Sequence, residues 1–374
     1  MNILIVHPGG GISDNPSLRS IINSFRNKSY NVTLWRRGSW SHDEYLPDIR
    51  YIEDHRAWWF IKAFFINHIC NHFFLKLIGY IEKKRWKNLE FDLIISIDRH
   101  GVIEGNFLTP LIKRHIHLSY EIFFESETSA RFKEIEKSSY QQVELLIIQD
   151  KVRAKIFEKE NKITLPIFLL PVAGGPFNFH NANQKKLSKN ILALGSLAKW
   201  TMIPDLVDYV TDNKISFKVI LHGRYGGLSK QLEEKIRGNN YLKISSKHFI
   251  DEQEFYQFVS EAYAGFAMYR SIKDHKYLGK NVEDLGLSSG KISTFLSCGV
   301  PVITNISGEF ASLIKEYKAG VIISGVHEVP YAIEQISQSR ESFSAGAKQL
   351  FQEKLSFSLY EKKLMQIISD FKTN

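Results

Sequence analysis

Hydrophobic positions divide the chain into short apolar runs that are separated by stretches with helical spacing. Residues 3–6 are apolar and end at a glycine-rich turn, residues 16–25 have helical periodicity, and residues 31–35 resemble a strand. This order predicts a β-α-β opening. Later runs are continuously apolar, which is typical of parallel strands buried on both faces of a sheet. These runs cover residues 91–98, 115–124 and 143–150.

The alternation starts again after a segment rich in proline and glycine, so we expect a linker over residues 176–189. With 374 residues, the chain also exceeds what a single hydrophobic core usually holds. The pattern predicts the α/β class, with two Rossmann-like, doubly wound parallel-sheet domains that face a cleft. The expected parts are an N-terminal domain (1–175), a C-terminal domain (190–355) and a C-terminal helix (356–374) that packs back on the N-terminal domain.

Composition and net charge indicate in which compartment the protein acts and what kind of partner it binds. The two cysteines, Cys70 and Cys298, lie far apart in apolar contexts, and the amino terminus lacks the basic start and long apolar stretch of a secretory signal. We therefore expect a cytoplasmic location. The net charge of +9 favours an anionic partner. Because the basic residues are spread over both halves without a basic tail, nucleic acid is not expected as that partner.

One segment, residues 57–87, breaks the pattern because it is unusually aromatic and amphipathic. Its polar face is expected to hold His68, His72, Lys76 and Lys83 at helical spacing, with Phe73 among the residues off that face. Polar residues interrupt the segment too often for a bilayer span, whereas its basic end suits anionic lipid headgroups. Two interpretations stay open: peripheral contact with the inner face of the cytoplasmic membrane, or a helix packed between the sheet and solvent.

Candidate chemistry is sought in the loops after strands, because open α/β sheets bind ligands at the carboxyl ends of their strands. In the second half these loops combine cations with small residues, which suits a diphosphate held by helix-start amides and positive side chains. They contain Gly195, Ser196, Lys199, Arg224, Tyr269, Arg270, Ser288, Ser289, Gly290 and Lys291. The helix that begins near Lys291 is expected to end at Gly299, because glycine readily takes the left-handed conformation that ends helices. The loops of the first half contain Gly9, Gly10, Gly11, Asp98, His100 and Glu121.

Several other enzyme classes are disfavoured by missing motifs. The glycine-rich turn lacks the G-x-G-x-x-G spacing of a dinucleotide site, and the sequence has neither a P-loop nor a G-x-S-x-G elbow. His68 and His72 lack a third ligand, so no metal site is expected.

Four segments occur in a suggestive order: NILALGSLAKW, FKVILHGRYGG, EFYQFVSEAYAGFAMYRS and GKISTFLSCGVPVITNISGEFASLIKEYKAGVIIS. Together they resemble the C-terminal half of GT-B fold glycosyltransferases, most closely family 4 (glycosyltransferase group 1). The resemblance implies a nucleotide-sugar donor, UDP- or GDP-linked, bound mainly by the C-terminal domain. It also implies an acceptor bound by the N-terminal domain and hexosyl transfer with no essential metal or resident cofactor.

By position, the resemblance assigns several residues to the donor. Gly195 and Ser196 would border its phosphates with Lys199 nearby, and the start of the helix at Lys291 would meet the diphosphate. The remaining donor candidates are Arg224, Arg270, Ser288, Ser289, Gly290 and Thr294. The family usually has a ribose-binding Glu where this chain has Thr294, and a second Glu where it has Gly286, so the paired-glutamate motif is absent.

The expected chemistry follows from the leaving group. Negative charge develops on the nucleoside diphosphate during transfer, and Lys291, Arg224 and the amides of Ser289 and Gly290 would stabilise it. An inverting enzyme also needs a general base, for which Asp98, His100 and Glu121 are candidates. Asp98 and Glu121 also have structural interpretations, as a turn former and as a carboxylate paired with a cation.

The expected function is a glycosyltransferase that acts on a saccharide or lipid-linked acceptor in the biosynthesis of a cell-surface glycan, such as capsule, O-antigen, LPS or glycoprotein. The alternatives are a non-catalytic sugar-nucleotide or glycan-binding partner, and a GT-B sugar-nucleotide epimerase.

Overall fold

The computed structural model describes residues 1–9, 11–12, 15–37, 46, 48–69, 72–112, 114–175, 189–223, 229–247, 249, 252–273, 275 and 278–373. The chain forms two compact units. Unit 1 comprises Met1–Val172, Asp274–Asn281 and Tyr360–Asn374, and unit 2 comprises Ala173–Lys273 and Val282–Leu359. Of the expected linker, only Lys189 lies within the described residues. The segment 274–281, which the sequence placed in the C-terminal domain, belongs to unit 1.

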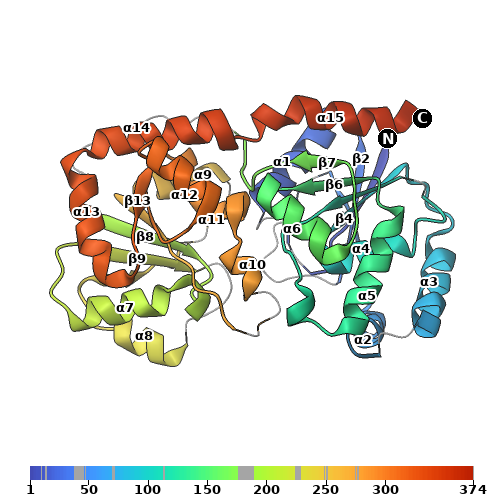
Figure 1. The fold of residues 1–374 in the computed structure, drawn as a ribbon, viewed down its shortest axis with the longest axis horizontal. Helices are drawn as coiled ribbons and strands as arrows, with labels where there is room; N and C mark the ends of the chain where they lie inside the picture. The colour runs from blue at the N-terminus through green and yellow to red at the C-terminus, as the bar shows by residue number, and fades with distance from the viewer. Residues whose placement is uncertain are drawn as a thin grey trace. The chain divides into compact units, whose positions relative to one another are not determined.

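Unit 1 contains a seven-stranded parallel sheet with the order β3-β2-β1-β4-β5-β6-β7 (Figure 1). Its strands are β1 Asn2–Val6, β2 Asn31–Arg36, β3 Arg50–Glu53, β4 Leu93–Ile97, β5 His115–Leu118, β6 Leu145–Ile148 and β7 Ile167–Leu169. The strand order reverses between β1 and β4, so the chain is doubly wound there as predicted. β3 was not predicted, because this short edge strand has no buried residue.

The helices of unit 1 cover this sheet. They are α1 Pro16–Asn27, α2 Arg56–Phe64, the π-helix Phe65–Ile69, α3 His72–Trp86, α4 Asp98–Asn106, α5 Ala130–Ser139 and α6 Lys151–Asn161, with 3₁₀ turns at Glu125–Glu127 and Tyr140–Gln142. Buried side chains of α4, α5 and α6, including Ile103, Phe132 and Phe157, form one core with β6. The C-terminal helix α15, Ser358–Thr373, contacts α1 where Ser24 Oγ donates to Glu361 Oε1 at 2.7 Å.

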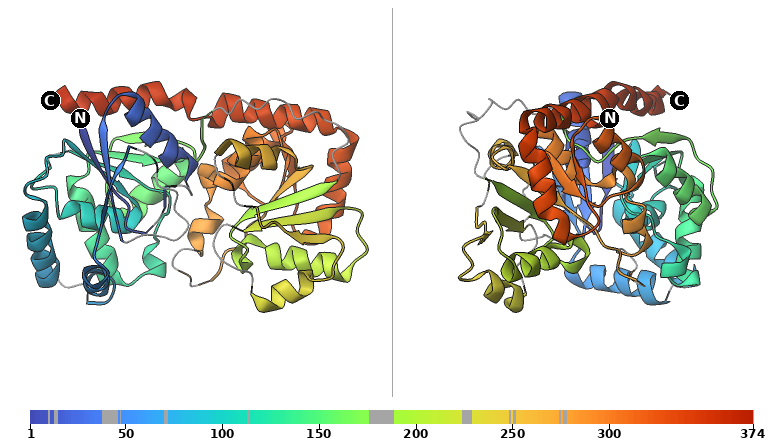
Figure 2. Two further views of the ribbon diagram at one scale, coloured as in Figure 1. Left: turned by 180° about the vertical axis from the view of Figure 1, so that it is seen from behind. Right: turned by 60° about the vertical axis from the view of Figure 1, so that its left-hand side comes forward.

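Unit 2 contains a six-stranded parallel sheet with the order β10-β9-β8-β11-β12-β13 (Figure 2). Its strands are β8 Asn190–Gly195, β9 Lys218–Gly223, β10 Leu242–Ile244, β11 Ala264–Ala267, β12 Val302–Thr304 and β13 Gly320–Ile322. The order reverses between β8 and β11. Both units are therefore doubly wound α/β structures, which confirms the predicted fold class.

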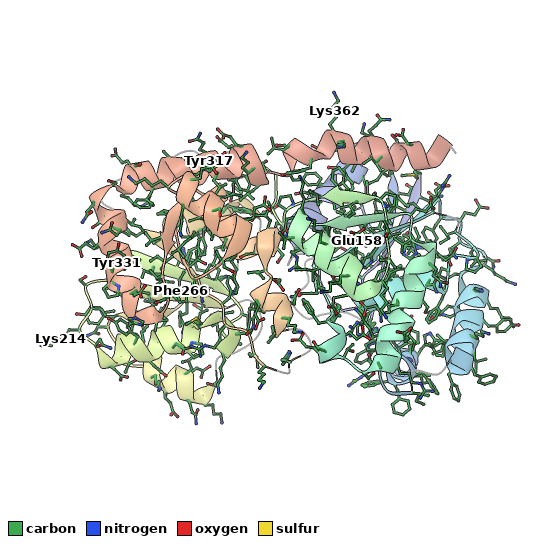
Figure 3. All side chains as sticks on the ribbon, viewed as in Figure 1. Glu158, Lys214, Phe266, Tyr317, Tyr331 and Lys362 are labelled. Carbon is green, nitrogen blue, oxygen red and sulfur yellow. The ribbon has the colours of Figure 1, made fainter. Side chains whose placement is uncertain are left out.

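Helices cover both faces of the second sheet. They are α7 Ile203–Asp212, α8 Lys230–Ile236, α9 Glu252–Ser260, α11 Gly290–Ser297, α12 Gly308–Glu316, α13 Val329–Gln338 and α14 Arg340–Leu350. The short elements are Lys199–Thr201, Gly286–Ser288, Val326–Glu328 and the π-helix Phe351–Leu355. The short helix α10, Lys280–Glu283, begins in unit 1 and ends in unit 2. Phe266, labelled in Figure 3, belongs to the core shared with α7, α8 and α13. A second core contains buried residues of α9, α11, α12 and α14.

The end of α11 follows the local sequence. Gly299 has φ +67°, the left-handed conformation predicted for it, and its N–H donates to the carbonyl of Leu296 at 3.0 Å. Phe295 on α11 packs so closely on β11 that a Cβ on Gly265 would lie 2.3 Å from its ring. This contact fixes the position of α11 against the sheet.

Candidate functional site

The first group of candidate residues lies in unit 2, where Lys291 sits in the first turn of α11. Ser289 caps this helix, since its Oγ accepts a hydrogen bond from the N–H of Ile292 at 3.2 Å. The side chain of Lys291 runs alongside the end of β8, where a Cβ built on Gly195 would lie 3.0 Å from Lys291 Cε. Gly195 has φ +82°, which a residue with a side chain rarely adopts. The glycine thus provides space for the lysine.

Two aromatic rings hold the ammonium group of Lys291. Its Nζ lies 4.9 Å from the ring centroid of Trp200 and 5.6 Å from that of Tyr269, and the two centroids are 5.8 Å apart. Such cation–π contacts attract an ammonium without neutralising its charge. Lys291 is therefore positioned at the reversal of strand order between β8 and β11, where open α/β sheets bind ligands.

Tyr269 is itself fixed by several hydrogen bonds. Its hydroxyl shares a 2.5 Å hydrogen bond with Ser289 Oγ, its N–H donates to Asn305 Oδ1 at 2.7 Å, and Asn305 Nδ2 donates back to its carbonyl at 2.7 Å. Burial raises the pKa of Tyr269 above its usual value, so the phenol stays neutral. Tyr269 thus links the helix start to the ends of β11 and β12.

The other donor candidates make separate contacts. The side chain of Arg270 forms a 2.8 Å ion pair with Asp205, and the backbone N–H of Arg270 donates to the carbonyl of Trp200 at 2.8 Å. The hydroxyl of Ser288 donates to the carbonyl of Leu285 within its own turn, at 2.5 Å.

The remaining donor candidates have fewer side-chain contacts that position them. Ser196 contributes its carbonyl, which accepts from Thr201 Oγ1 at 3.0 Å. Lys199 is exposed, Gly290 begins α11, and Thr294 is half-buried on the same helix. Arg224 lies outside the described residues.

The second group lies in unit 1 and centres on Asp98, at the junction of β4 and α4. Asp98 has φ +52°, and its Oδ1 accepts hydrogen bonds from the N–H groups of Tyr120 at 2.6 Å and Glu121 at 3.0 Å. These amides are therefore not available to a sheet, and β5 ends at Leu118 rather than at residue 124 as predicted. Burial raises the pKa of Asp98 to about 6, although the two hydrogen bonds oppose this shift.

Glu121 follows in the loop that Asp98 shapes. Its Oε2 accepts a hydrogen bond from Asn281 Nδ2, while Asn281 Oδ1 accepts from the N–H of Ile122 at 2.9 Å and from Arg153 Nη2 at 3.1 Å. Burial and the charge of Asp98 raise the pKa of Glu121 to about 8, and Arg153 and Asn281 partly offset this increase. The carboxyl is therefore mostly protonated at pH 7.

Arg153 fixes the same loop from the other side. Its Nη2 donates to the carbonyl of Tyr120 at 2.8 Å and its Nε donates to Gln149 Oε1 at 2.8 Å, while Gln149 Nε2 donates to the carbonyl of Ser119 at 2.6 Å. These residues are buried, so the loop is held rigidly. The proposed pairing of Glu121 with a cation is thus indirect, through Asn281.

The remaining candidates of unit 1 lie around this loop or away from it. His100 on α4 contacts Arg37, with 3.4 Å between its Nδ1 and Arg37 Nη2, and its ring centroid lies 5.9 Å from that of Phe132. Gly9 is exposed and Gly11 is partly exposed. Gly10 is outside the described residues.

Trp200 and Asn281 were not predicted, whereas Tyr269 was expected beside Arg270 in a loop after a strand. Trp200 directly follows Lys199, so its position after a strand was a usable signal. Asn281 gave no such signal, because it is 160 positions from its partner Glu121.

Comparisons with known proteins agree with the predicted resemblance. Residues 230–368, which include Lys291 and Tyr269, match the family described as glucosyltransferase 3-like, C-terminal domain. No curated protein sequence matches the chain.

Solved structures match over nearly the whole length. A sucrose-phosphate synthase from Thermosynechococcus elongatus is 14% identical with a TM-score of 0.72, covering 100% of this chain and 99% of its own. HepE from Anabaena in complex with UDP-glucose is 12% identical with a TM-score of 0.68, covering 99% and 100%. The trehalose-6-phosphate synthase OtsA is 10% identical with a TM-score of 0.68, covering 100% and 99%.

These matches show that the chain has the GT-B fold of two parallel-sheet α/β domains. Membership of family 4 stays a prediction.

Proposed function

We propose that this chain, which has the GT-B fold and a glucosyltransferase 3-like C-terminal region, is a glycosyltransferase that uses a nucleotide-diphosphate sugar. One observation carries the proposal: the ammonium group of Lys291 is held over Trp200 and Tyr269 at the start of α11. Lys291 and Tyr269 lie within the matched region. A diphosphate fits this arrangement, because the helix start places a positive dipole end beside the positive charge of the lysine.

The same arrangement supports catalysis of sugar transfer. As the bond to the sugar breaks, negative charge develops on the leaving diphosphate, and Lys291 stabilises that charge more strongly than the charge of the ground state. Trp200 and Tyr269 position the ammonium without neutralising its charge, and a cation there attracts phosphate oxygens. We propose that this positive charge replaces a metal ion, so EDTA should leave the rate unchanged.

We propose UDP-glucose as the first donor to test, since HepE, which shares the fold, has been solved with this molecule. Lys291 binds the diphosphate. We propose that the nucleotide lies near the other donor candidates, Ser196, Lys199, Arg270 and Thr294.

We propose that unit 1 binds the acceptor through the loop that holds Glu121. As a carboxylate, Glu121 takes the proton from the acceptor hydroxyl, and Asp98, Asn281 and Arg153 fix its position. This role predicts inversion at the anomeric carbon, because a base beside the acceptor favours direct displacement from the opposite face. We extend the proposal to a saccharide or lipid-linked acceptor in cell-surface glycan synthesis, which the exposed apolar face of α2 and α3 favours.

The test is the release of UDP from UDP-glucose, measured with and without octyl glucoside or octyl N-acetylglucosaminide as acceptor. A transferase releases UDP faster with an acceptor, and Lys291→Gln should reduce this rate by a factor of about 100 or more. Lys318→Gln is the matched control, because Lys318 also lies over a ring, that of Phe343 at 5.3 Å.

Other outcomes would overturn the proposal. Conversion of the nucleotide sugar without an acceptor would indicate an epimerase. Donor binding without turnover over a wider panel of donors and acceptors would indicate a binding partner.

A further inference from the structure

Helix α2 buries a charged side chain and exposes apolar ones, which is the reverse of an ordinary surface helix. Its one buried residue is Lys62, whereas Phe60 and Phe64 are 53% and 54% exposed and Ile61 is also exposed. A helix that covers a sheet in water normally buries its apolar stripe and exposes its charges. The exposed apolar side chains of α2 therefore suit an apolar environment on the outer side of the helix.

Buried charges occupy the inner side of α2. Lys62 Nζ forms ion pairs with Asp54, with Glu82 at 3.2 Å and with Glu104 at 2.7 Å, and all four side chains are inaccessible to solvent. It also lies 4.2 Å from the ring centroid of Trp35 on β2. Because buried ions need charged partners, this cluster fixes α2 to β2, α3 and α4 in a single orientation.

Helix α3 continues the same exposed surface. Phe73, Leu77 and Tyr80 are spaced i, i+4 and i+7, so they share one face, and Phe73 and Tyr80 are 70% and 65% exposed. Lys76 and Lys84 lie on this face too. The sequence had placed Phe73 off the face of Lys76, so that expectation was wrong. The opposite face is buried, with Leu75 and Ile78 among its residues.

A chain of ring contacts joins the two helices. Ring centroids lie 5.8 Å apart between Phe64 and Phe65, 4.6 Å between Phe65 and Phe74, and 5.6 Å between Phe74 and Phe73. Helices α2 and α3 lie at the margin of unit 1 in Figures 1 and 2. Their exposed apolar side chains thus form one surface. We call it the aromatic face; it consists of Phe60, Ile61, Phe64, Phe73, Leu77 and Tyr80.

The charges around the aromatic face are almost all positive. Residues 56–87 contain seven lysines and arginines and one acidic residue, Glu82, which belongs to the buried cluster. Arg56, Lys76, Lys84 and Lys87 are exposed. Two copies of this face would bring like charges together, whereas anionic lipid headgroups complement them.

We propose that the aromatic face docks on an anionic phospholipid bilayer, with its apolar side chains in the interfacial region and its cations against the headgroups. No helix among the described residues is long and apolar enough to cross a bilayer. The face instead has the features of an interfacial helix pair, namely aromatic anchors beside lysine and arginine.

The test is sedimentation of the full chain with vesicles of phosphatidylcholine, either alone or with 30 mol% phosphatidylglycerol, where the fraction is a chosen condition of roughly physiological anionic content. The wild-type protein should partition onto the anionic vesicles at least about tenfold more strongly, and added salt should weaken this binding. The variant Phe60→Ser/Phe64→Ser/Phe73→Ser should bind about tenfold more weakly or not at all.

The matched control is Leu111→Ser/Val152→Ser/Tyr331→Ser, which removes three exposed apolar side chains elsewhere, including Tyr331 of Figure 3. This control should bind like the wild type. Lys76→Gln/Lys84→Gln should remove most of the preference for anionic vesicles. All these side chains are exposed, and circular dichroism checks that each variant is folded.

Equal binding of the wild type and the Phe variant would overturn the proposal. So would the absence of any vesicle binding, or a dimer of the wild type that the Phe variant abolishes in sedimentation velocity. These results do not depend on sugar transfer, so they are separate from those that test the proposed function.

Discussion

The side chain of Lys291 packs directly against Gly195, such that a Cβ on the glycine would lie 3.0 Å from Lys291 Cε. Gly195 ends β8, the first strand of the unit 2 sheet, and Lys291 lies in the first turn of α11. The absence of a side chain at residue 195 therefore decides where the ammonium group of Lys291 can lie.

Gly195→Ala should weaken the binding of a nucleoside diphosphate by a factor of about 10 or more, because the methyl group displaces Lys291 from a charge-assisted contact. Gly238→Ala is the matched control. Gly238 has the similar φ of +83°, but nothing lies within 4 Å of its Cβ position, so this variant introduces only the backbone strain. Titration calorimetry with UDP measures both; equal affinities in the two variants would contradict a positioning role for Gly195.

The transfer rate should depend on the protonation of Glu121. Burial and Asp98 raise its pKa to about 8, so the carboxylate that acts as a base is a minor species at pH 7. We expect log(kcat/KM) to rise with a slope of one below pH 8 and to level off above it. Glu121→Gln should reduce the plateau by a factor of about 100 to 10,000. A flat profile, together with an active Glu121→Gln variant and retention of configuration, would assign the proton transfer to the leaving phosphate instead.

Stability should fall in mild acid because of two histidines on β5. Burial lowers the pKa of His115 to about 3 and that of His117 well below its usual value, while Ser96 hydrogen-bonds to both rings. The unfolded chain takes up protons at these residues near pH 6.5 and the folded chain does not, so stability is lost as the pH falls from about 6.5 toward 3.

Each histidine should contribute a slope of about 1.4 kcal/mol per pH unit in this range. Urea unfolding between pH 4.5 and 6 measures the slope, which His115→Gln should reduce by about that amount. An unchanged slope would show that His115 takes up its proton in the folded state.

Lys62→Met should lower the free energy of unfolding by about 3–5 kcal/mol, because it leaves the buried carboxyl groups of Asp54, Glu82 and Glu104 without their shared cation. Lys84→Met, on the exposed face of α3, should change it by less than about 0.5 kcal/mol. Urea denaturation at pH 7.5 compares the two, and similar small losses would mean that the cluster does not fix α2.

Local pattern was sufficient for much of the fold. The strand Ile3–Val6, the helix starting at Pro16 and the left-handed Gly299 depend on neighbouring residues, and the structure has them within a few positions of their predicted bounds. The end of β5 was predicted wrongly, because the carboxylate of Asp98 takes the amides of Tyr120 and Glu121, which are more than 20 positions away.

The candidate sites were predictable to a similar degree. Lys291 and Gly195 stand after strands, so the sequence could name them, but their contact requires the sheet order of unit 2. The sequence could not predict which side of α2 is buried. An amphipathic pattern does not say which side meets the buried carboxylates of Asp54 and Glu104.

The most direct test of the central claim compares a nucleoside diphosphate with its monophosphate. Thermal shift with UDP, GDP, CDP and dTDP first selects the base, and calorimetry then measures both forms with the wild type and Lys291→Gln. The wild type should bind the diphosphate about 10 to 100 times more tightly than the monophosphate, and Lys291→Gln should lose that preference, because the distal phosphate meets Lys291. A preference that survives in Lys291→Gln, or the absence of binding by the wild type to all four diphosphates, would contradict the account.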